Sequence, residues 1–388
     1  MKNLLLSISF SLISLISFAQ FPVGHRQITY QDPARSNRSV TTEIYYPGVS
    51  AGESVTAAAG TFPIIVFGHG FMMNYDAYLY FKDAMVPDGY IVVFPTTETG
   101  ASPSHPNFGL DLAFLINKLI SENTNNASPF YTHIGATSAI MGHSMGGGSS
   151  FLGCENNVVP TVMVTFAAAN TTPPSIAAAT NITIPCLVIS GAVDCVAPPS
   201  AHQIPMYDSL ASACKVYLSI KNGGHCYFGD YNFACTFGES TCMPTIPITR
   251  AAQQDVAVDF VKLYLDYYLK GNAAAWTLFN DSLNTSQRIT FQKYCLSVNV
   301  EPINFEKYVQ VFPNPASNEL TISFPTFNSS EVSINVMNVL GEKLITRTVN
   351  SENKLFEEKL NLKNFRSGIY FVEIQTRDFK ITKKIIKE

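Results

Sequence analysis

The sequence predicts a mostly parallel α/β sheet covered by helices on both faces, followed by a small all-β sandwich. Two observations predict the sheet. Short, continuous apolar runs alternate with segments of helical spacing, which is typical of strands buried on both faces. One apolar run, Ala139–Met141, leads directly into Gly142-His143-Ser144-Met145-Gly146. A third observation predicts the sandwich, because beyond residue 300 the segments become short and alternating and the cysteines stop.

The expected strands of the first region are apolar runs bounded by turns or glycines. The first two, 27–30 and 41–46, are expected to pair antiparallel, and the others are 62–67, 90–94, 139–141, 161–166, 184–190 and 215–220. Apolar residues at helical spacing predict helices over 110–120, 204–210 and 256–269. In the second region, alternating segments predict strands at 320–324, 331–338, 343–349, 368–375 and 379–386.

Charge and composition predict the domain boundaries. Residues 21–300 contain 30 charged residues in 280, whereas residues 301–388 contain 23 in 88. We therefore expect a first domain over 21–300, a linker over 301–308 and a second domain over 309–388. The basic start, the apolar run Leu4–Phe18 and the small residues before Gln20 are typical of a secretory signal peptide over 1–20. The alternative, a membrane anchor, needs a longer apolar run.

Composition limits the partners. The chain has 388 residues, of which 46% are hydrophobic, and a net charge of −4, so nothing indicates nucleic-acid binding. We expect a monomer that is exported and is not an integral membrane protein. All eight cysteines lie between Cys154 and Cys295. An even number in an exported chain predicts disulfides, with free buried thiols as the alternative.

The G-x-S-x-G sequence predicts a nucleophile at Ser144. A strand, a sharp turn and a helix start expose the serine Oγ above the sheet, and the flanking glycines allow the strand and the helix to approach closely. A serine nucleophile needs a histidine base and an acid, which follow it in that fold in the order Ser, acid, His. Such an arrangement is the triad of an α/β-hydrolase.

The required order restricts the base to two histidines. Only His202 and His225 lie beyond Ser144. His202 falls in a segment expected to be helical, whereas His225 follows the strand 215–220 through a short glycine-containing turn. Because catalytic loops gather at the carboxyl ends of parallel strands, we assign His225 as the base.

The acid must lie between the serine and the base. The candidates are Glu155, Asp194 and Asp208. Only Asp194 follows a buried strand, 184–190, through a short turn; the other two are expected on helices as surface carboxylates. Asp194 is therefore the predicted acid. His69 and His143 flank the site and are interpreted as packing or hydrogen-bonding residues.

Two backbone N–H groups are expected to bind the oxyanion. One belongs to Met145, directly after the nucleophile, and the other to Phe71, in the loop after the strand 62–67. The ring of Phe71 is also expected to face the substrate. Because Cys195 and Cys226 each follow a triad residue, we predict a Cys195–Cys226 disulfide between the acid and base loops. Neither has the C-x-x-C spacing of a metal site.

These residues resemble the bacterial cutinase-type polyester hydrolases, which include enzymes that cleave poly(ethylene terephthalate). The resemblance spans about residues 55–295. It implies an α/β-hydrolase fold, no cofactor, the triad Ser144, Asp194 and His225, and the oxyanion donors Phe71 and Met145, with Phe71 as an aromatic clamp. The segments that carry the resemblance are 142–148, 194–207, 215–217 and 222–225.

The chain departs from that family in two places. The family has a tryptophan soon after the strand that follows the elbow helix, where this chain reads Ala167-Ala168-Ala169-Asn170-Thr171-Thr172. Its single tryptophan is Trp276. The segment 226–250 is long and aromatic, and is either a loop over the cleft or a surface loop pinned by a Cys235–Cys242 disulfide.

The second region resembles a type IX secretion sorting domain. The resemblance implies export across the outer membrane by that machinery, usually with removal of the tail; the alternative is a carbohydrate-binding or adhesive β-sandwich. The matching segments are 311–315, 338–342, 367–370 and 383–387.

The predicted function is that of a secreted serine ester hydrolase acting on polyesters and small esters. The alternatives are a lipase-like or small-lactone hydrolase on the same fold and a non-catalytic surface binding protein.

Overall fold

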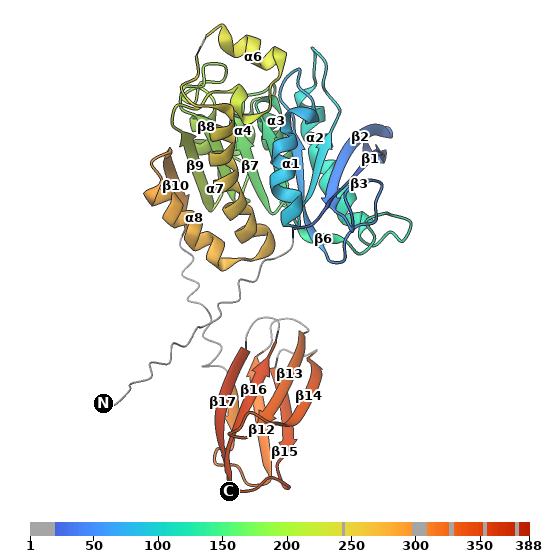
Figure 1. Ribbon diagram of the computed structural model, residues 1–388, viewed down its shortest axis with the longest axis vertical. Coiled ribbons are helices and arrows are strands. Elements are labelled where there is room, and N and C mark those ends of the chain that lie inside the picture. The colour runs from blue at the N-terminus through green and yellow to red at the C-terminus, as the bar shows by residue number, and fades with distance from the viewer. Residues whose placement is uncertain (1–19, 243–244, 297–308, 326–329, 352–354, 377–379) are drawn as a thin grey trace, which may run out of the picture. The chain divides into compact units, whose positions relative to one another are not determined.

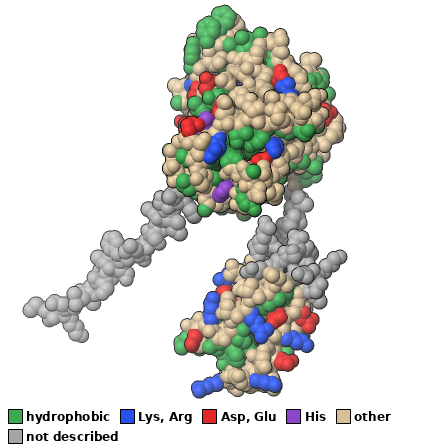
Figure 2. All heavy atoms as spheres, turned by 90° about the vertical axis from the view of Figure 1, so that its right-hand side faces the viewer, with side chains coloured by type: hydrophobic (Ala, Val, Ile, Leu, Met, Phe, Trp, Pro, Cys, Tyr) green, Lys and Arg blue, Asp and Glu red, His purple; other side chains and the backbone are tan. Residues whose placement is uncertain are grey.

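A computed structural model describes residues 20–242, 245–296, 309–325, 330–351, 355–376 and 380–388 (Figure 1). The chain divides into two compact units, Met1–Leu296 and Ser297–Glu388. Nearly all of the expected signal peptide and the whole expected linker, 301–308, lie outside the described residues. Figure 2 shows that charged side chains are sparse on the visible face of the first unit and dense on that of the second, as the composition predicts.

The first unit is built on a ten-stranded sheet in the order β10-β9-β8-β7-β6-β4-β5-β2-β1-β3. The six strands from β9 to β5 run parallel, and β10 and β2 join them antiparallel at either side. The predicted fold class is confirmed. The strands are β1 Val23–Asp32, β2 Arg38–Pro47, β3 Gly52–Glu53, β4 Phe62–Gly68, β5 Ile91–Pro95, β6 Ile134–His143, β7 Val162–Phe166, β8 Cys186–Gly191, β9 Cys214–Ile220 and β10 Ile289–Cys295.

Helices cover both faces of this sheet. Alternate residues of β4 enter two separate cores: Ile65 and Phe67 pack on one side, Ile64 and Val66 on the other. Figure 1 shows α1, α7 and α8 in front of the sheet, and their apolar residues belong to the first core. None of the described helices has the length and apolar content of a membrane span. The helices are α1 Leu79–Met85, α2 His105–Glu122, α3 Met145–Cys154, α4 Ser175–Ala179, α5 Gln203–Ser209, α6 Phe233–Ser240, α7 Arg250–Lys270 and α8 Ala273–Thr285.

The second unit is a sandwich of two antiparallel sheets, as predicted. One has the order β11-β12-β15 and the other β14-β13-β16-β17. Buried residues from both sheets, such as Leu320 and Val332, form one core. The strands are β11 Gln310–Phe312, β12 Glu319–Pro325, β13 Ser330–Met337, β14 Lys343–Ser351, β15 Leu355–Asn361, β16 Gly368–Gln375 and β17 Lys380–Lys387.

Candidate active site

Ser144 lies on the turn between β6 and α3. Its backbone has φ 52° and ψ −116°, a conformation that costs an L-residue free energy and that only its surroundings maintain. Its N–H donates to the carbonyl of Phe166 at 2.9 Å, and its own carbonyl accepts from the N–H groups of Gly148 and Ala169 at 2.9 and 3.0 Å. The neighbouring strand β7 therefore helps to hold the strained turn in place.

Glycines let the turn meet the end of β4. An ideal Cβ on Gly146 would lie 2.2 Å from the carbonyl oxygen of Gly68, and one on Gly142 would lie 2.4 Å from the carbonyl carbon and oxygen of Gly146. Real Cβ atoms do not approach so closely, so these positions require glycine. The approach places Ser144 beside the loop after β4, which carries Phe71.

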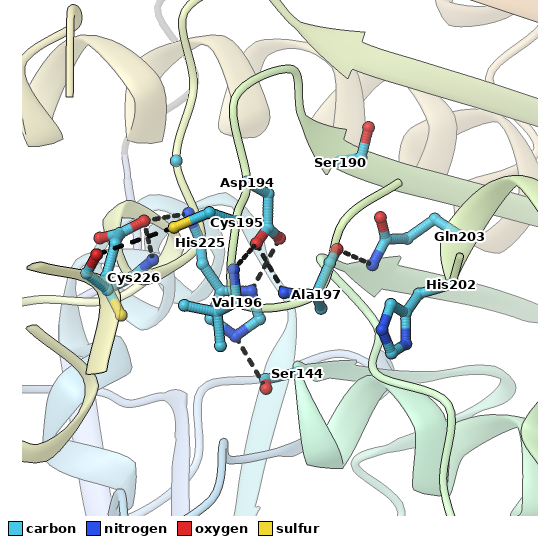
Figure 3. A network of polar contacts seen from close by, with 12 residues as sticks. Ser144, Ser190, Asp194, Cys195, Val196, Ala197, His202, Gln203, His225 and Cys226 are labelled. Atoms are coloured by element: carbon cyan, nitrogen blue, oxygen red, sulfur yellow. Dashed lines mark hydrogen bonds and ion pairs between the residues drawn. The ribbon is translucent and has the colours of Figure 1, made fainter. Parts of the chain in front are cut away.

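His225 joins the serine to a buried carboxylate (Figure 3). Its Nε2 lies 2.9 Å from the Ser144 Oγ, and its Nδ1 lies 2.7 Å from Asp194 Oδ2. The other carboxylate oxygen accepts the N–H groups of Val196 and Ala197 at 2.9 and 2.8 Å. Because the carboxylate only accepts, it fixes the hydrogen of His225 on Nδ1 and leaves the Nε2 lone pair facing the hydroxyl.

The three side chains arrive from the carboxyl ends of parallel strands. Ser144 follows β6, Asp194 follows β8 and His225 follows β9, so one edge of the sheet brings them together. His202 lies outside this line: its Nδ1 accepts the N–H of Asn170 at 2.9 Å, and burial lowers its pKa. The sequence argument that separated His225 from His202 therefore agrees with the geometry.

His143, next to the nucleophile, connects the loop after β4 to the base. The Gly70 N–H donates to the Tyr78 hydroxyl at 2.9 Å, which donates to His143 Nδ1 at 2.8 Å, and His143 Nε2–H donates to the His225 carbonyl at 3.0 Å. Complete burial, and then the neighbouring His225, hold the pKa of His143 well below its usual value, so the ring stays neutral in this chain of bonds. Its predicted hydrogen-bonding role is confirmed.

His69 lies beside Gly70 and faces two backbone carbonyls. Its ring is buried, with Nδ1 2.9 Å from the Gly70 carbonyl and Nε2 2.8 Å from the Thr97 carbonyl. Burial lowers its pKa.

A cavity of about 240 Å³ opens over the triad. Met145 begins α3, so its N–H has no acceptor within the helix. Phe71 lines the cavity and is half-exposed. Two larger hollows beside α7 are lined by no histidine. The lining of the triad cavity is mostly apolar: Phe71, Met72, Met73, Ser144, Val196, His225, Ala234, Cys235 and Gly238.

The single tryptophan plays no part in this cavity. Trp276 lies on α8, where its ring stacks on Tyr267 at 4.8 Å and on Phe279 at 5.4 Å between centroids. It packs the helical layer over the sheet, and Phe71 is the aromatic residue that lines the triad cavity.

The predicted Cys195–Cys226 disulfide is wrong. Cys195 pairs with Cys242 and Cys226 with Cys235, so the alternative Cys235–Cys242 pairing is wrong as well. The acid and base meet through their side chains, but the chain then diverges: after Asp194 it turns so that two N–H groups face the carboxylate, whereas after His225 it enters the 3-10 helix η4, Cys226–Phe228.

Of the remaining four cysteines, two form a disulfide and two are free buried thiols, the alternative that the sequence left open. Cys214 and Cys295 join β9 to β10, and Cys154 and Cys186 are free and buried. Burial raises the pKa of both free thiols, which makes them poor nucleophiles.

Sequence reasoning missed Glu239, a second buried carboxylate beside the base. Its Oε1 accepts the N–H groups of His225 and Cys226 at 2.5 and 3.2 Å. The residue as a whole is only 3% exposed to solvent. It belongs to α6, inside the long segment after the base. Only Asp230 and Glu239 are acidic between 226 and 249, so a scan for carboxylates in that segment would have found it.

Comparisons with known proteins agree with this geometry. The model of the PET hydrolase-like family matches residues 20–243, and that of a secretion system C-terminal sorting domain matches residues 310–388. A bis(hydroxyethyl) terephthalate hydrolase of Streptomyces coelicolor is 25% identical over 185 residues, which are 47% of this chain and 54% of that protein. The protein named Cutinase est1 of Thermobifida alba is 37% identical over 89 residues, 22% of this chain and 28% of that protein.

The chain thus spans about half the length of the first relative and just over a quarter of the second. The family match is broader, because it includes β1 to β9 and all three residues of the hydrogen-bonded line from Ser144 to Asp194. The chain belongs to the PET hydrolase-like family and carries a type IX secretion sorting domain at its C-terminal end.

Proposed function

We propose that the protein is a secreted serine carboxylic-ester hydrolase that cleaves polyesters through an acyl-enzyme on Ser144. The observation that carries the proposal is the continuous line Ser144 Oγ, His225 and Asp194, with contacts of 2.9 and 2.7 Å at the floor of an apolar cavity. Nucleophile and base within hydrogen-bond reach, with the base oriented by a third group, are what acyl transfer by serine requires.

The reaction then has two halves. The Ser144 Oγ attacks the ester carbonyl carbon while His225 Nε2 takes the hydroxyl proton, and Asp194 stabilises the imidazolium. The N–H groups of Met145 and Phe71 bind the oxyanion. The tetrahedral intermediate collapses, the C–O bond breaks, and the alcohol leaves with the proton from Nε2. Water, deprotonated by His225, attacks the acyl-enzyme, and the free acid and Ser144 are released.

Polyesters are the proposed substrates, with small soluble esters also accepted. One relative is named for hydrolysing bis(hydroxyethyl) terephthalate and the other is named a cutinase. The cavity is open at its mouth and of modest volume, which suits one ester and its immediate neighbours rather than a long buried acyl chain. The half-exposed Phe71 offers an aromatic face at that mouth.

We further propose that the chain acts as an exported monomer with a separable sorting tail. The catalytic domain comprises 21–300, the linker 301–308 and the sorting domain 309–388. Support comes from the family match over 310–388, from a triad supplied by one chain, and from three disulfides, which persist in oxidising compartments outside the cytosol.

The replacement Ser144→Ala tests this function. The wild type should hydrolyse a short p-nitrophenyl ester and release soluble products from a polyester film, and S144A should lose roughly 10³-fold or more in kcat on both. The matched control is Ser149→Ala, a buried serine on α3, the helix that follows Ser144, whose hydroxyl has no hydrogen-bond partner. Turnover retained by S144A in clean protein, or an equal loss in S149A, contradicts the assignment.

A further inference from the structure

Helix α6 has one side at the catalytic cavity and another in solvent. Ala234, Cys235 and Gly238 line the cavity together with Ser144 and His225. Phe233 and Phe237, one turn apart on the same helix, are 71% and 63% exposed, and their rings stack with centroids 6.0 Å apart. The disulfides Cys226–Cys235 and Cys195–Cys242 tie this segment to the base and acid loops.

The exposed aromatic residues of α6 continue an apolar rim around the cavity. Figure 1 places α6 at the end of the first unit above β8, and Figure 2 shows hydrophobic side chains gathered at that end. No lysine or arginine occurs between residues 226 and 249. We name the exposed, stacked rings of Phe233 and Phe237 on α6 the mouth patch; Phe71, Met72 and Val196, also exposed, line the cavity beside it.

Such a surface is costly in water unless something binds it. Single exposed apolar side chains are ordinary on a protein surface, but a group rimming a cavity marks a binding site. The two disulfides keep α6 beside the loops that carry Asp194 and His225, so Phe233 and Phe237 stay near the cavity.

We propose that the mouth patch binds the chain of a polyester on either side of the ester held over Ser144. This inference rests on the proposed function. A polymer is far longer than a cavity of about 240 Å³ can hold, so its flanking repeat units must lie on the surface beside the mouth. The patch is apolar, uncharged and continuous with the cavity, and its stacked rings offer faces to apolar or aromatic units. A small soluble ester is too short to reach it.

The double replacement Phe233→Ala and Phe237→Ala tests the patch. We expect adsorption to a polyester film and product release from it to fall about 10-fold or more, while kcat/KM on p-nitrophenyl acetate stays within about twofold, because loss of two aromatic contacts corresponds to that range. The control is Leu110→Ala with Leu278→Ala, two comparably exposed apolar residues on α2 and α8. It should leave film binding unchanged.

Several results would overturn the proposal. They are an unchanged adsorption isotherm and film release in the double variant, a matching loss on the soluble ester, or conversion of a wild-type dimer to a monomer, which would make the patch an interface between two copies. If the double variant does not fold, F233A and F237A measured singly decide the same question. Failure of the proposed function is separate: the wild type would then hydrolyse neither substrate, whereas the adsorption isotherm would still report on the patch.

A second inference concerns the inner end of α6, where Glu239 holds the backbone of the base loop. Its carboxylate accepts the N–H groups of His225 and Cys226, and an ideal Cβ on Gly224 would lie only 2.5 Å from its Oε1. From α7, the Arg250 guanidinium donates to the carbonyls of Cys226 and Gly229. The loop is therefore held by α6 through the N–H groups of His225 and Cys226, and by α7 through the carbonyls of Cys226 and Gly229 and through both backbone groups of Gly224, which hydrogen-bond to Gln253.

We propose that Glu239 is a positioning residue for His225. The ring of His225 must reach Ser144 and Asp194 at once, and small displacements of a catalytic group cost large factors in rate. The role requires an acceptor oxygen at this place and not a negative charge, so glutamine should replace glutamate and alanine should not.

Measurements on a soluble ester distinguish this role from a merely structural one. Glu239→Ala should lower kcat about 10-fold or more with KM little changed, and Glu239→Gln should recover most of the loss with the wild-type pH profile. A folded E239A with unaltered kcat, or an E239Q as impaired as E239A, overturns the proposal. Should E239A fail to fold, the kcat of E239Q alone decides, because near wild-type turnover is required of it.

Discussion

The two sides of the triad are held in different ways. On the serine side, glycine backbones touch: Gly146 packs on Gly68 so closely that no side chain fits between them. On the side of the acid and base, two disulfides and the buried carboxylate of Glu239 bind the loops to α6 and to Cys242 just after it. The sheet positions all three residues, and the loops of the acid and base are held in addition by the segment that follows the base.

This difference separates the contacts that stabilise the fold from the contacts that set the geometry of the site. The contact at Gly146 joins β4, β6 and α3, which form the centre of the sheet, so disturbing it disturbs the whole unit. The disulfides at Cys195 and Cys226 join loops that lie beyond the ends of the strands, so we expect their removal to loosen the site and leave the sheet intact. The following predictions test that separation, from the largest expected effect to the smallest.

A methyl group at Gly146 should destabilise the catalytic unit severely. The added Cβ would lie 2.2 Å from the Gly68 carbonyl oxygen, where neither backbone can yield. We expect Gly146→Ala to lose about 3 kcal/mol or more of unfolding free energy, at the upper end for overpacking, or not to fold. Urea unfolding measures the loss. Gly238→Ala is the matched control, since a Cβ there meets no atom within 4 Å; near wild-type stability of G146A would contradict the argument.

Removing the Cys195–Cys242 bridge should affect both stability and rate. The replacement Cys195→Ser with Cys242→Ser should cost about 2–4 kcal/mol by freeing the unfolded chain, and should lower kcat because the acid loop is no longer tied to α6. Removing the Cys214–Cys295 disulfide, which joins the first residue of β9 to the last residue of β10, should cost a similar amount of unfolding free energy and leave kcat unchanged. Equal kcat values in the two double variants would erase the proposed distinction.

The neutral His143 between the two sides should make the fold sensitive to acid. Above about pH 6.5 a histidine is neutral in both the folded and unfolded states and adds no pH dependence. Below it, the unfolded chain takes up a proton that the buried His143 cannot, because burial lowers its pKa. The free energy of unfolding should therefore fall as pH falls from 6.5 to 5, by up to about 1.4 kcal/mol per pH unit.

The replacement His143→Gln tests that assignment. The amide oxygen can accept from Tyr78 and the amide nitrogen can donate to the His225 carbonyl, but the amide does not titrate. In this variant the unfolding free energy should depend less steeply on pH than in the wild type. The difference in slope should be up to about 1.4 kcal/mol per pH unit, which corresponds to one proton. Identical slopes would place the acid sensitivity elsewhere, for example at His69 or His202, whose pKa values burial also lowers.

The smallest effect is expected from removing the tail. A chain of residues 21–300 contains both sides of the triad and should hydrolyse a soluble ester at a rate within about twofold of the full chain, as separate compact domains do. A folded but inactive fragment would make the tail part of the enzyme and would move the proposed boundary.

The sheet and the hydrogen-bonded line from Ser144 through His225 to Asp194 were predictable because their signals are local. Each parallel strand contains a short apolar run, the elbow has a short sequence pattern, and the required order of serine, acid and histidine restricts the candidates to few residues. The disulfides and Glu239 were not predictable in this way, because they depend on where α6 lies in space. Of the eight residues of α6 only Glu239 is buried, so the helix lacks the buried apolar stripe by which α2 and α7 were found.

The nested arrangement of the two bridges around α6 has a consequence for survival among proteases. Phe237 stands on an exposed helix, which is where a protease that prefers aromatic residues would cut. A single cut there leaves Ser144, Asp194 and His225 together on the N-terminal fragment. The C-terminal fragment, with α7 and β10, stays attached through Cys195–Cys242 and Cys214–Cys295. Outside a cell, where reductants are scarce, such a nicked molecule remains a single covalent body.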